Sequence, residues 1–176
     1  MRDPAQLLAQ IERRAQARAR ALPRQEAARR LWPGIAFRVR GQRLVAPLAE
    51  VSEILYYPPL TRVPGTKPWV CGIANVRGNL LPIMDLKGYL YGEQTPTHRR
   101  ARVLVVSHRG LAAGLLVDEV LGLRHFDEAD RLAEVPEADE PLRPYLRRGY
   151  RDEEGSWPVF SMFRLAENPL FLQAAV

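Results

Sequence analysis

The chain has 176 residues, 47% of them hydrophobic and 26% charged, with a formal net charge of +6. This length suits one domain, or two very small ones that share a core, and the hydrophobic share argues against a disordered chain. No uncharged stretch approaches the ~20 apolar residues that a membrane-spanning helix needs. Direct insertion into a membrane is therefore not expected.

The N-terminal segment carries most of the net charge. Its first 30 positions hold eight arginines and three acidic residues, a surplus of five (8 − 3), so the rest of the chain is close to neutral. Asp3 and Pro4 have the order of a helix N-cap and a first helical residue. Apolar residues then recur at helical spacing, at Leu7, Leu8, Ile11, Ala15, Ala19 and Leu22.

Residues 1–34 are therefore predicted to form a basic helical N-terminal extension in front of a domain at 35–176. A second short helix is expected to run from Pro23 to Leu31, and residues 32–34 to break it. The arginines of the extension fit either a solvated helix face or a contact with a partner or a membrane surface.

The start of the chain and its cysteine content both indicate the cytoplasm. The Arg-rich beginning lacks the continuous apolar core and the small-residue cleavage site of a secretory signal. Cys71 is the one cysteine, so the chain cannot form an internal disulfide. Because Cys71 lies in an apolar run, we expect it to be a small core residue.

After Gly34 the apolar period changes from 3.6 to 2, which is typical of β-strands. Gly41-Gln42 and Arg77-Gly78-Asn79 are the turns of two predicted hairpins, and a short helix is expected at 66–70. The strands predicted in this half are residues 35–39, 44–48, 51–57, 70–76 and 80–84.

The second half repeats the pattern, with turns at His108-Arg109-Gly110 and at residues 152–155, and an acidic loop at 127–144. A helical turn is expected at 162–167. The strands predicted here are residues 102–107, 111–117, 120–126, 145–150 and 157–161. Many short strands at roughly ten-residue spacing indicate small barrels or a sandwich.

The sequence offers no catalytic, cofactor or metal site. The three histidines, His98, His108 and His125, stand singly, without the spacing that holds a metal. Asp118 and Glu119 are adjacent, so on a strand they point to opposite faces and cannot act as an acid/base pair on one substrate. No nucleophile elbow, phosphate-binding loop or dinucleotide fingerprint occurs.

The hairpin at 72–86 is unusual because Asn75 and Arg77 interrupt an otherwise apolar sequence. An arginine beside a turn is more often a solvated charge than a binding residue. Its planar fork nevertheless suits a bidentate carboxylate, and Glu53, inside the apolar segment 51–55, is the candidate partner. If such a pair is partly buried, removal of one partner would be strongly destabilising.

Several linked motifs resemble the CheW family, whose pattern is V-x-E-I, T-x-V-P and GxxNxRGxxxPxxDL. They are Val51-Ser-Glu-Ile-Leu, Thr61-Arg-Val-Pro, and the run from Pro68, Pro-Trp-Val-Cys-Gly-Ile-Ala-Asn-Val-Arg-Gly-Asn-Leu-Leu-Pro-Ile-Met-Asp-Leu. Two downstream segments, Arg102-Val-Leu-Val-Val and Ala113-Gly-Leu-Leu-Val-Asp-Glu-Val-Leu, resemble the family's next hairpin. The resemblance covers about residues 35–167.

The resemblance implies a mainly β, CheW-like fold of two small SH3-like five-stranded barrels. It also implies a non-catalytic, cytoplasmic adaptor, recruited to membrane-associated receptor arrays, that couples the tip of a methyl-accepting-type chemoreceptor to the regulatory domain of a CheA-type histidine kinase. The residues matched to the receptor-binding groove are Val51, Glu53, Ile54, Asn75, Arg77 and Gly78, with Glu53 and Arg77 as a salt-bridged pair. Together with the Arg-rich extension, the Ile73-Ala-Asn-Val-Arg-Gly-Asn-Leu run resembles the branch of the family that serves twitching motility of type IV pili.

Two alternatives are a basic SH3-like or OB-like barrel that binds nucleic acid and, behind it, an enzyme with an unrecognised site. Such a barrel is expected to interleave cations and exposed aromatics on a strand face. Here the excess charge lies on the predicted extension and the strands are largely apolar, which favours the adaptor.

Overall fold

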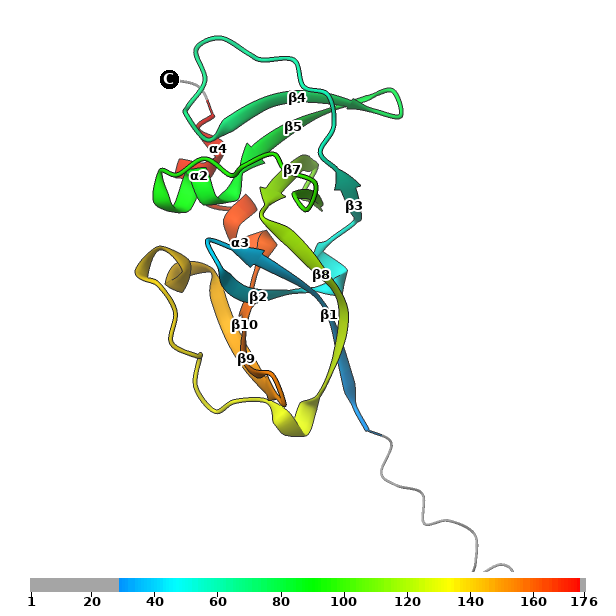
Figure 1. The fold of residues 1–176 in the computed structure, drawn as a ribbon, viewed down its shortest axis with the longest axis vertical. Coiled ribbons are helices and arrows are strands. Elements are labelled where there is room, and N and C mark those ends of the chain that lie inside the picture. The colour runs from blue at the N-terminus through cyan, green and yellow to red at the C-terminus, as the bar shows by residue number, and fades with distance from the viewer. Residues whose placement is uncertain (1–28, 175–176) are drawn as a thin grey trace, which may run out of the picture. The chain divides into compact units, whose positions relative to one another are not determined.

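The structure is a computed structural model that describes residues 29–174, so most of the predicted helical extension lies outside the described residues. The described part is mainly β and holds two five-stranded sheets (Figure 1). The first sheet has the order β8-β1-β2-β10-β9 and the second β3-β6-β7-β5-β4.

The strands of the first sheet are β1 (Leu31–Val39), β2 (Gln42–Pro47), β8 (Glu119–Asp127), β9 (Leu146–Asp152) and β10 (Gly155–Phe160). Those of the second sheet are β3 (Glu53–Tyr56), β4 (Val70–Val76), β5 (Asn79–Asp85), β6 (Arg102–His108) and β7 (Leu111–Val117). The helices are short: α2 (Leu86–Tyr91), α3 (Met162–Ala166) and α4 (Pro169–Leu172), with 3-10 turns η1 (Leu48–Glu50), η2 (Glu128–Asp130) and η3 (Glu140–Tyr145).

Three of the hairpins turn on the same dipeptide, Arg-Gly. These are Arg40-Gly41 between β1 and β2, Arg77-Gly78 between β4 and β5, and Arg109-Gly110 between β6 and β7. In all three both residues have positive φ, near 50° for the arginine and 76° to 84° for the glycine. Two successive positive φ angles are the signature of a type I′ turn, which matches the twist of the flanking strands. The three predicted hairpins are confirmed, although the first turns on Arg40-Gly41 and not on Gly41-Gln42.

The two sheets are closed in the same way. After the edge strand β3 of the second sheet, Thr61 pairs with Ile73 on the opposite edge strand, β4. After the edge strand β8 of the first sheet, Arg131 pairs with Tyr150 on the opposite edge strand, β9. Each sheet therefore curls until its edges meet, which gives the two small barrels that the resemblance implies.

A glycine makes room for each closing segment. A Cβ on Gly72 of β4 would lie 2.5 Å from the Thr61 carbonyl oxygen, and Gly72 also has a φ of +144°. A Cβ on Gly149 of β9 would lie 2.3 Å from the ring of Pro136. No side chain fits at either position without a shift of its neighbour.

Alternating residues of the strands face different cores. Val103 and Val105 of β6 belong to the interior of the second barrel, whereas Leu104 and Val106 of the same strand join a core that both barrels share. Burial on both faces explains why β6 is a continuous apolar run instead of an alternating one. The shared core has 18 buried residues, from Ile35 on β1 to Phe171 on α4.

Asp85 ties α2 to the loop that follows it. Its buried carboxylate caps the helix through the Gly88 amide (3.0 Å) and also accepts from the amide (2.6 Å) and hydroxyl (2.7 Å) of Thr95. A buried carboxylate with three donors is well satisfied. The aspartate of the sequence motif therefore has a structural role here.

Several details differ from the sequence predictions. The first strand begins at Leu31, so residues 31–34 belong to the sheet and do not form a helix end and a break. Leu31 is also the first residue of the compact unit that holds both sheets. Residues 68–69 form a turn and none of residues 66–70 is helical, and the helices α2 and α4 were not predicted.

Candidate functional site

Glu53 and Arg77 form the predicted pair. Glu53 is the first residue of β3, and Arg77 occupies the turn between β4 and β5. The Arg77 Nη1 atom donates to Glu53 Oε1 at 2.7 Å, and Nη2 donates to Oε2. The contact is therefore bidentate, the strongest geometry for a guanidinium and a carboxylate. Because β3 and β4 are opposite edges of the second sheet, the pair also bridges the closure of that barrel.

The pair shifts the titration of both groups. The hydrogen bond from Arg77, aided by its charge, lowers the pKa of Glu53 below its ordinary value of 4.5, although some desolvation opposes the shift. The same contact raises the pKa of Arg77. Both groups are therefore ionised at neutral pH.

The pair is exposed. The Arg77 side chain keeps 71% of its accessible surface and that of Glu53 keeps 29%. The large cost expected for breaking a partly buried pair therefore does not apply, because exposed ion pairs contribute little to folding stability. A charged pair held in fixed geometry at the surface is free to contact another molecule.

Asn75 and Gly78 shape the turn that carries Arg77. The Asn75 Oδ1 atom accepts a hydrogen bond from the Gly78 amide at 2.9 Å. Gly78 has a φ of 84° and open space around it, so its role is the backbone conformation. Together they hold Arg77 at a positive φ, a conformation that costs a non-glycine residue energy.

Ile54 and Val51 lie in different environments. Ile54 follows Glu53 on β3 and keeps 40% of its surface exposed. Val51 precedes β3, is half-buried and packs against the shared core. The two cavities with volumes of about 1040 and 390 Å³ are not lined by any of the six predicted groove residues. A groove at this position remains a prediction.

Two exposed apolar residues on the elements that carry the pair were missed by the sequence analysis. Tyr56 lies two residues after Ile54 on β3, on the same strand face, with 76% of its surface exposed and its ring under the Arg102 guanidinium at 4.3 Å. Leu80 is directly opposite Asn75 in the β4–β5 hairpin and is 73% exposed. The signal for both was available, because each alternates with an inward-facing leucine.

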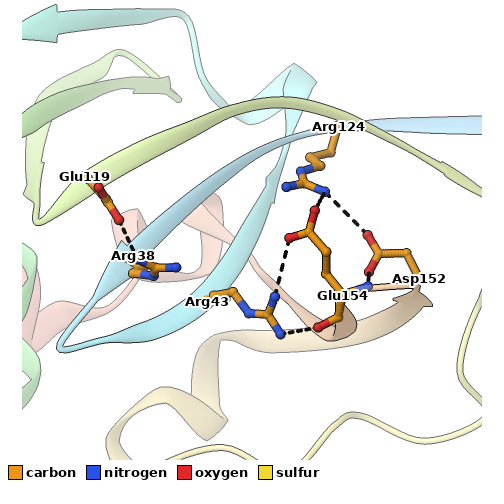
Figure 2. Close-up of polar contacts among 6 residues, drawn as sticks. All are labelled: Arg38, Arg43, Glu119, Arg124, Asp152 and Glu154. Atoms are coloured by element: carbon orange, nitrogen blue, oxygen red, sulfur yellow. Dashed lines mark hydrogen bonds and ion pairs between the residues drawn. The ribbon is translucent and has the colours of Figure 1, made fainter. Parts of the chain in front are cut away.

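Three arginines of the first barrel, Arg38, Arg43 and Arg124, have carboxylate partners within the chain (Figure 2). Arg124 of β8 pairs with Glu154 at 2.6 Å and Asp152 at 3.6 Å, and Arg43 of β2 pairs with Glu154 at 3.5 Å. Both guanidinium groups lie 4.8 Å from the ring centre of the buried Trp157. This network fastens the tip of the β9–β10 hairpin to β2 and β8.

The described residues show no metal-binding group of three or more His, Cys, Asp or Glu side chains. Cys71 is half-buried against the interior of the second barrel, less buried than expected for a core residue. Burial raises the pKa of its thiol to about 12, so it is not a thiolate nucleophile at neutral pH. None of the helices described within residues 29–174 is long and apolar enough to cross a membrane.

The CheW-like domain family matches residues 33–169. Protein PilI of Pseudomonas aeruginosa is 45% identical over 176 residues, which is 100% of this chain and 98% of that protein. Chemotaxis protein CheW of Bacillus subtilis is 32% identical over 85 residues, 48% of this chain and 54% of that protein.

A solved structure shares the fold. The scaffolding protein CheW of Thermoanaerobacter tengcongensis superimposes with a TM-score of 0.66 at 21% identity, over 78% of this chain and 94% of that one. The family match and the full-length similarity show that the chain belongs to the CheW-like family, whose members are scaffolding and adaptor proteins of chemotaxis-type signalling.

Proposed function

We propose that the chain is a non-catalytic adaptor that couples a methyl-accepting-type chemoreceptor to a CheA-type histidine kinase, in a chemosensory system that controls type IV pilus twitching motility. The observation that carries this proposal is the 45% identity to PilI over the whole chain, which includes the basic N-terminal segment. The adaptor acts in the cytoplasm, at receptor arrays on the membrane.

The receptor contacts the face around Glu53 and Arg77. The ion pair is held by β3 and the β4–β5 hairpin, and the same two elements expose the apolar side chains of Ile54, Tyr56 and Leu80. Protein interfaces take most of their binding energy from a few aromatic, apolar and arginine side chains. A held arginine gives a partner a guanidinium with a defined direction, at little further entropy cost.

The kinase contacts a separate surface. An adaptor with two separate faces raises the effective concentration of one partner near the other, and this needs no reaction at the adaptor itself. Loss of one face is then expected to leave the other nearly unchanged, because distant sites act almost independently.

The charge arrangement of the first barrel weighs against the nucleic-acid alternative. Arg38, Arg43 and Arg124 each have a carboxylate partner within the chain. Binding to phosphates would have to break these pairs or share them.

Calorimetry with purified components tests the proposal. The full chain is titrated separately with the cytoplasmic tip of a chemoreceptor and with the regulatory domain of a CheA-type kinase encoded by the same genome. We expect both to bind, and a ternary complex to form on mixing. A chain that binds neither, or whose partners exclude each other, contradicts the proposal. Binding to an oligonucleotide that weakens steeply with added salt would support the alternative instead.

A further inference from the structure

Glu50 is a buried acid that the face around Glu53 and Arg77 does not account for. It keeps only 5% of its surface and ends η1, on the segment that crosses from the first barrel to the second. Charged side chains are rarely buried unless they are paired and hydrogen-bonded. Its contacts therefore indicate what this crossover is attached to.

Those contacts all come from the C-terminal third of the chain. The Ser161 hydroxyl lies 3.1 and 3.2 Å from the two carboxylate oxygens, and the Phe163 amide donates at 3.2 Å. Arg147 of β9 adds its charge at 3.5 Å. Ser161 is also the N-cap of α3, where its hydroxyl accepts from the Arg164 amide at 3.3 Å. One carboxylate thus joins the crossover to β9 and to the start of α3.

The residues that follow Glu50 are held in place by hydrogen bonds to β6. The Ser52 amide and hydroxyl both donate to the Val105 carbonyl, at 2.8 and 3.0 Å, and Glu53 begins the pairing of β3 with β6. Only Val51 and Ser52 separate the buried carboxylate from Glu53. A displacement of Glu50 must therefore be absorbed within two residues or passed to β3.

We propose that Glu50 is a positioning residue that couples the receptor-binding strand β3 to α3 and β9 of the first barrel. It holds the crossover in one place, so the Glu53 carboxylate meets Arg77 in the bidentate geometry and Ile54 points outward. The inference rests on the proposed receptor-binding function of that face, which it deepens by assigning the element that sets its geometry. Movement of α3 or β9 would reach the receptor face through this carboxylate.

Hydrogen exchange of the full-length chain tests the coupling without any partner. Glu50→Ala should speed exchange in residues 48–56 and leave β7 at 111–117, which does not pair with β3, protected as in the wild type. Glu50→Gln, which keeps the size of the side chain, should do the same more weakly and serves if Glu50→Ala does not fold. Glu93→Ala is the matched control, because Glu93 is an exposed acid that pairs with Arg40 and Lys87. Faster exchange to the same extent everywhere would show a general stability role and overturn the proposal.

Binding measured on the same variants tests whether the positioning of β3 also affects receptor binding. Glu50→Ala should weaken receptor binding about tenfold, since the loss of a buried hydrogen-bonding partner has a cost of that order. Kinase binding should stay within about twofold of the wild type. Adding Ser161→Ala to Glu50→Ala should cause no further loss, because both changes break the same contact.

A wild-type chain that binds receptor and a Glu50→Ala variant that binds it equally well would overturn the positioning role. If the wild type itself fails to bind receptor, the proposed function is wrong, and the exchange experiment still decides whether Glu50 fixes β3.

Discussion

The two barrels are closed by the same backbone arrangement but fastened by different charges. In both, the segment after an edge strand bridges to the opposite edge at the residue that follows a glycine. The glycine is Gly149 in the first barrel and Gly72 in the second. The first barrel adds Arg43 and Arg124, which pair with the β9–β10 turn (Figure 2). Both also lie over the buried Trp157. In the second barrel the exposed pair of Glu53 and Arg77 joins the two opposite edges instead.

This difference separates stability from recognition. Arg43 and Arg124 keep 31% and 30% of their side-chain surface and are already paired, so they serve the barrel to which they belong. A charge pair that is open to solvent contributes little to folding but remains accessible. We therefore expect substitutions of the first-barrel arginines to change folding stability. Substitutions of the Glu53–Arg77 pair should change partner binding.

The largest effect is expected when the first barrel loses its central ring. Trp157 is fully buried and packs against Phe126, so Trp157→Ala should lower the free energy of unfolding by about 3–5 kcal/mol. Urea denaturation followed by circular dichroism measures the change. Tyr56→Ala, at an exposed aromatic of the second barrel, is the control and should stay within about 0.5 kcal/mol of the wild type. Equal losses of unfolding free energy in the two variants would contradict the proposed difference between the barrels.

The next effect concerns the closing glycines. Gly72→Ala and Gly149→Ala each force a new Cβ against the closing segment and should cost about 1–3 kcal/mol. Gly72 should be the more sensitive, because its neighbour is backbone, whereas that of Gly149 is a proline ring. Gly41→Asn provides a control at a positive φ with open space, which asparagine tolerates. A Gly72→Ala chain as stable as the wild type would show that this barrel is not closed in the described way.

A smaller effect is expected from the arginines themselves. Arg124→Ala removes two carboxylate contacts and the contact with Trp157, and should cost about 1 kcal/mol. Arg77→Ala should leave the melting temperature nearly unchanged. Thermal unfolding of both variants in the same buffer checks this. A larger loss of melting temperature for Arg77→Ala than for Arg124→Ala would mean that the Glu53–Arg77 pair, and not the first-barrel network, supports stability.

The smallest effect is expected on the pKa of Glu53. Because the pKa of Glu53 is lowered in the folded chain, its pairing with Arg77 is complete at neutral pH and is lost only as pH falls through that lowered value. Side-chain carboxyl NMR should find the Glu53 pKa below 4.5 in the wild type and back near 4.5 in Arg77→Ala. An unchanged pKa in the variant would mean that the two groups do not interact in solution.

The sequence predicted the hairpins well, because their turns and alternation are local. It missed the start of β1, since Pro33 and Gly34 read as a break. Pro33 is tolerated because β1 pairs there only with β8, and its pairing with β2 begins at Gly34. Pro82 and Pro158 likewise lie just before the second neighbour joins β5 and β10. Such pairings link distant segments, which a local pattern does not reveal.

The helix α2 was missed for a different reason. It follows β5 without a loop, so the apolar run simply continues into Leu86. Its signals were present, namely Asp85 as N-cap and Gly92, at a φ of 70°, as C-cap. For the candidate site, motif spacing predicted the Glu53–Arg77 pair but not its exposure, because exposure depends on how the sheet curls.

The measurement that tests the central claim most directly is the binding of Arg77→Glu to each partner separately. This change reverses the charge at the receptor face and leaves the fastening of the first barrel untouched. Calorimetry should show receptor binding reduced at least tenfold and kinase binding close to that of the wild type, with an unchanged circular dichroism spectrum. An equal loss for both partners in a folded protein would mean that one surface serves both, and would contradict the account.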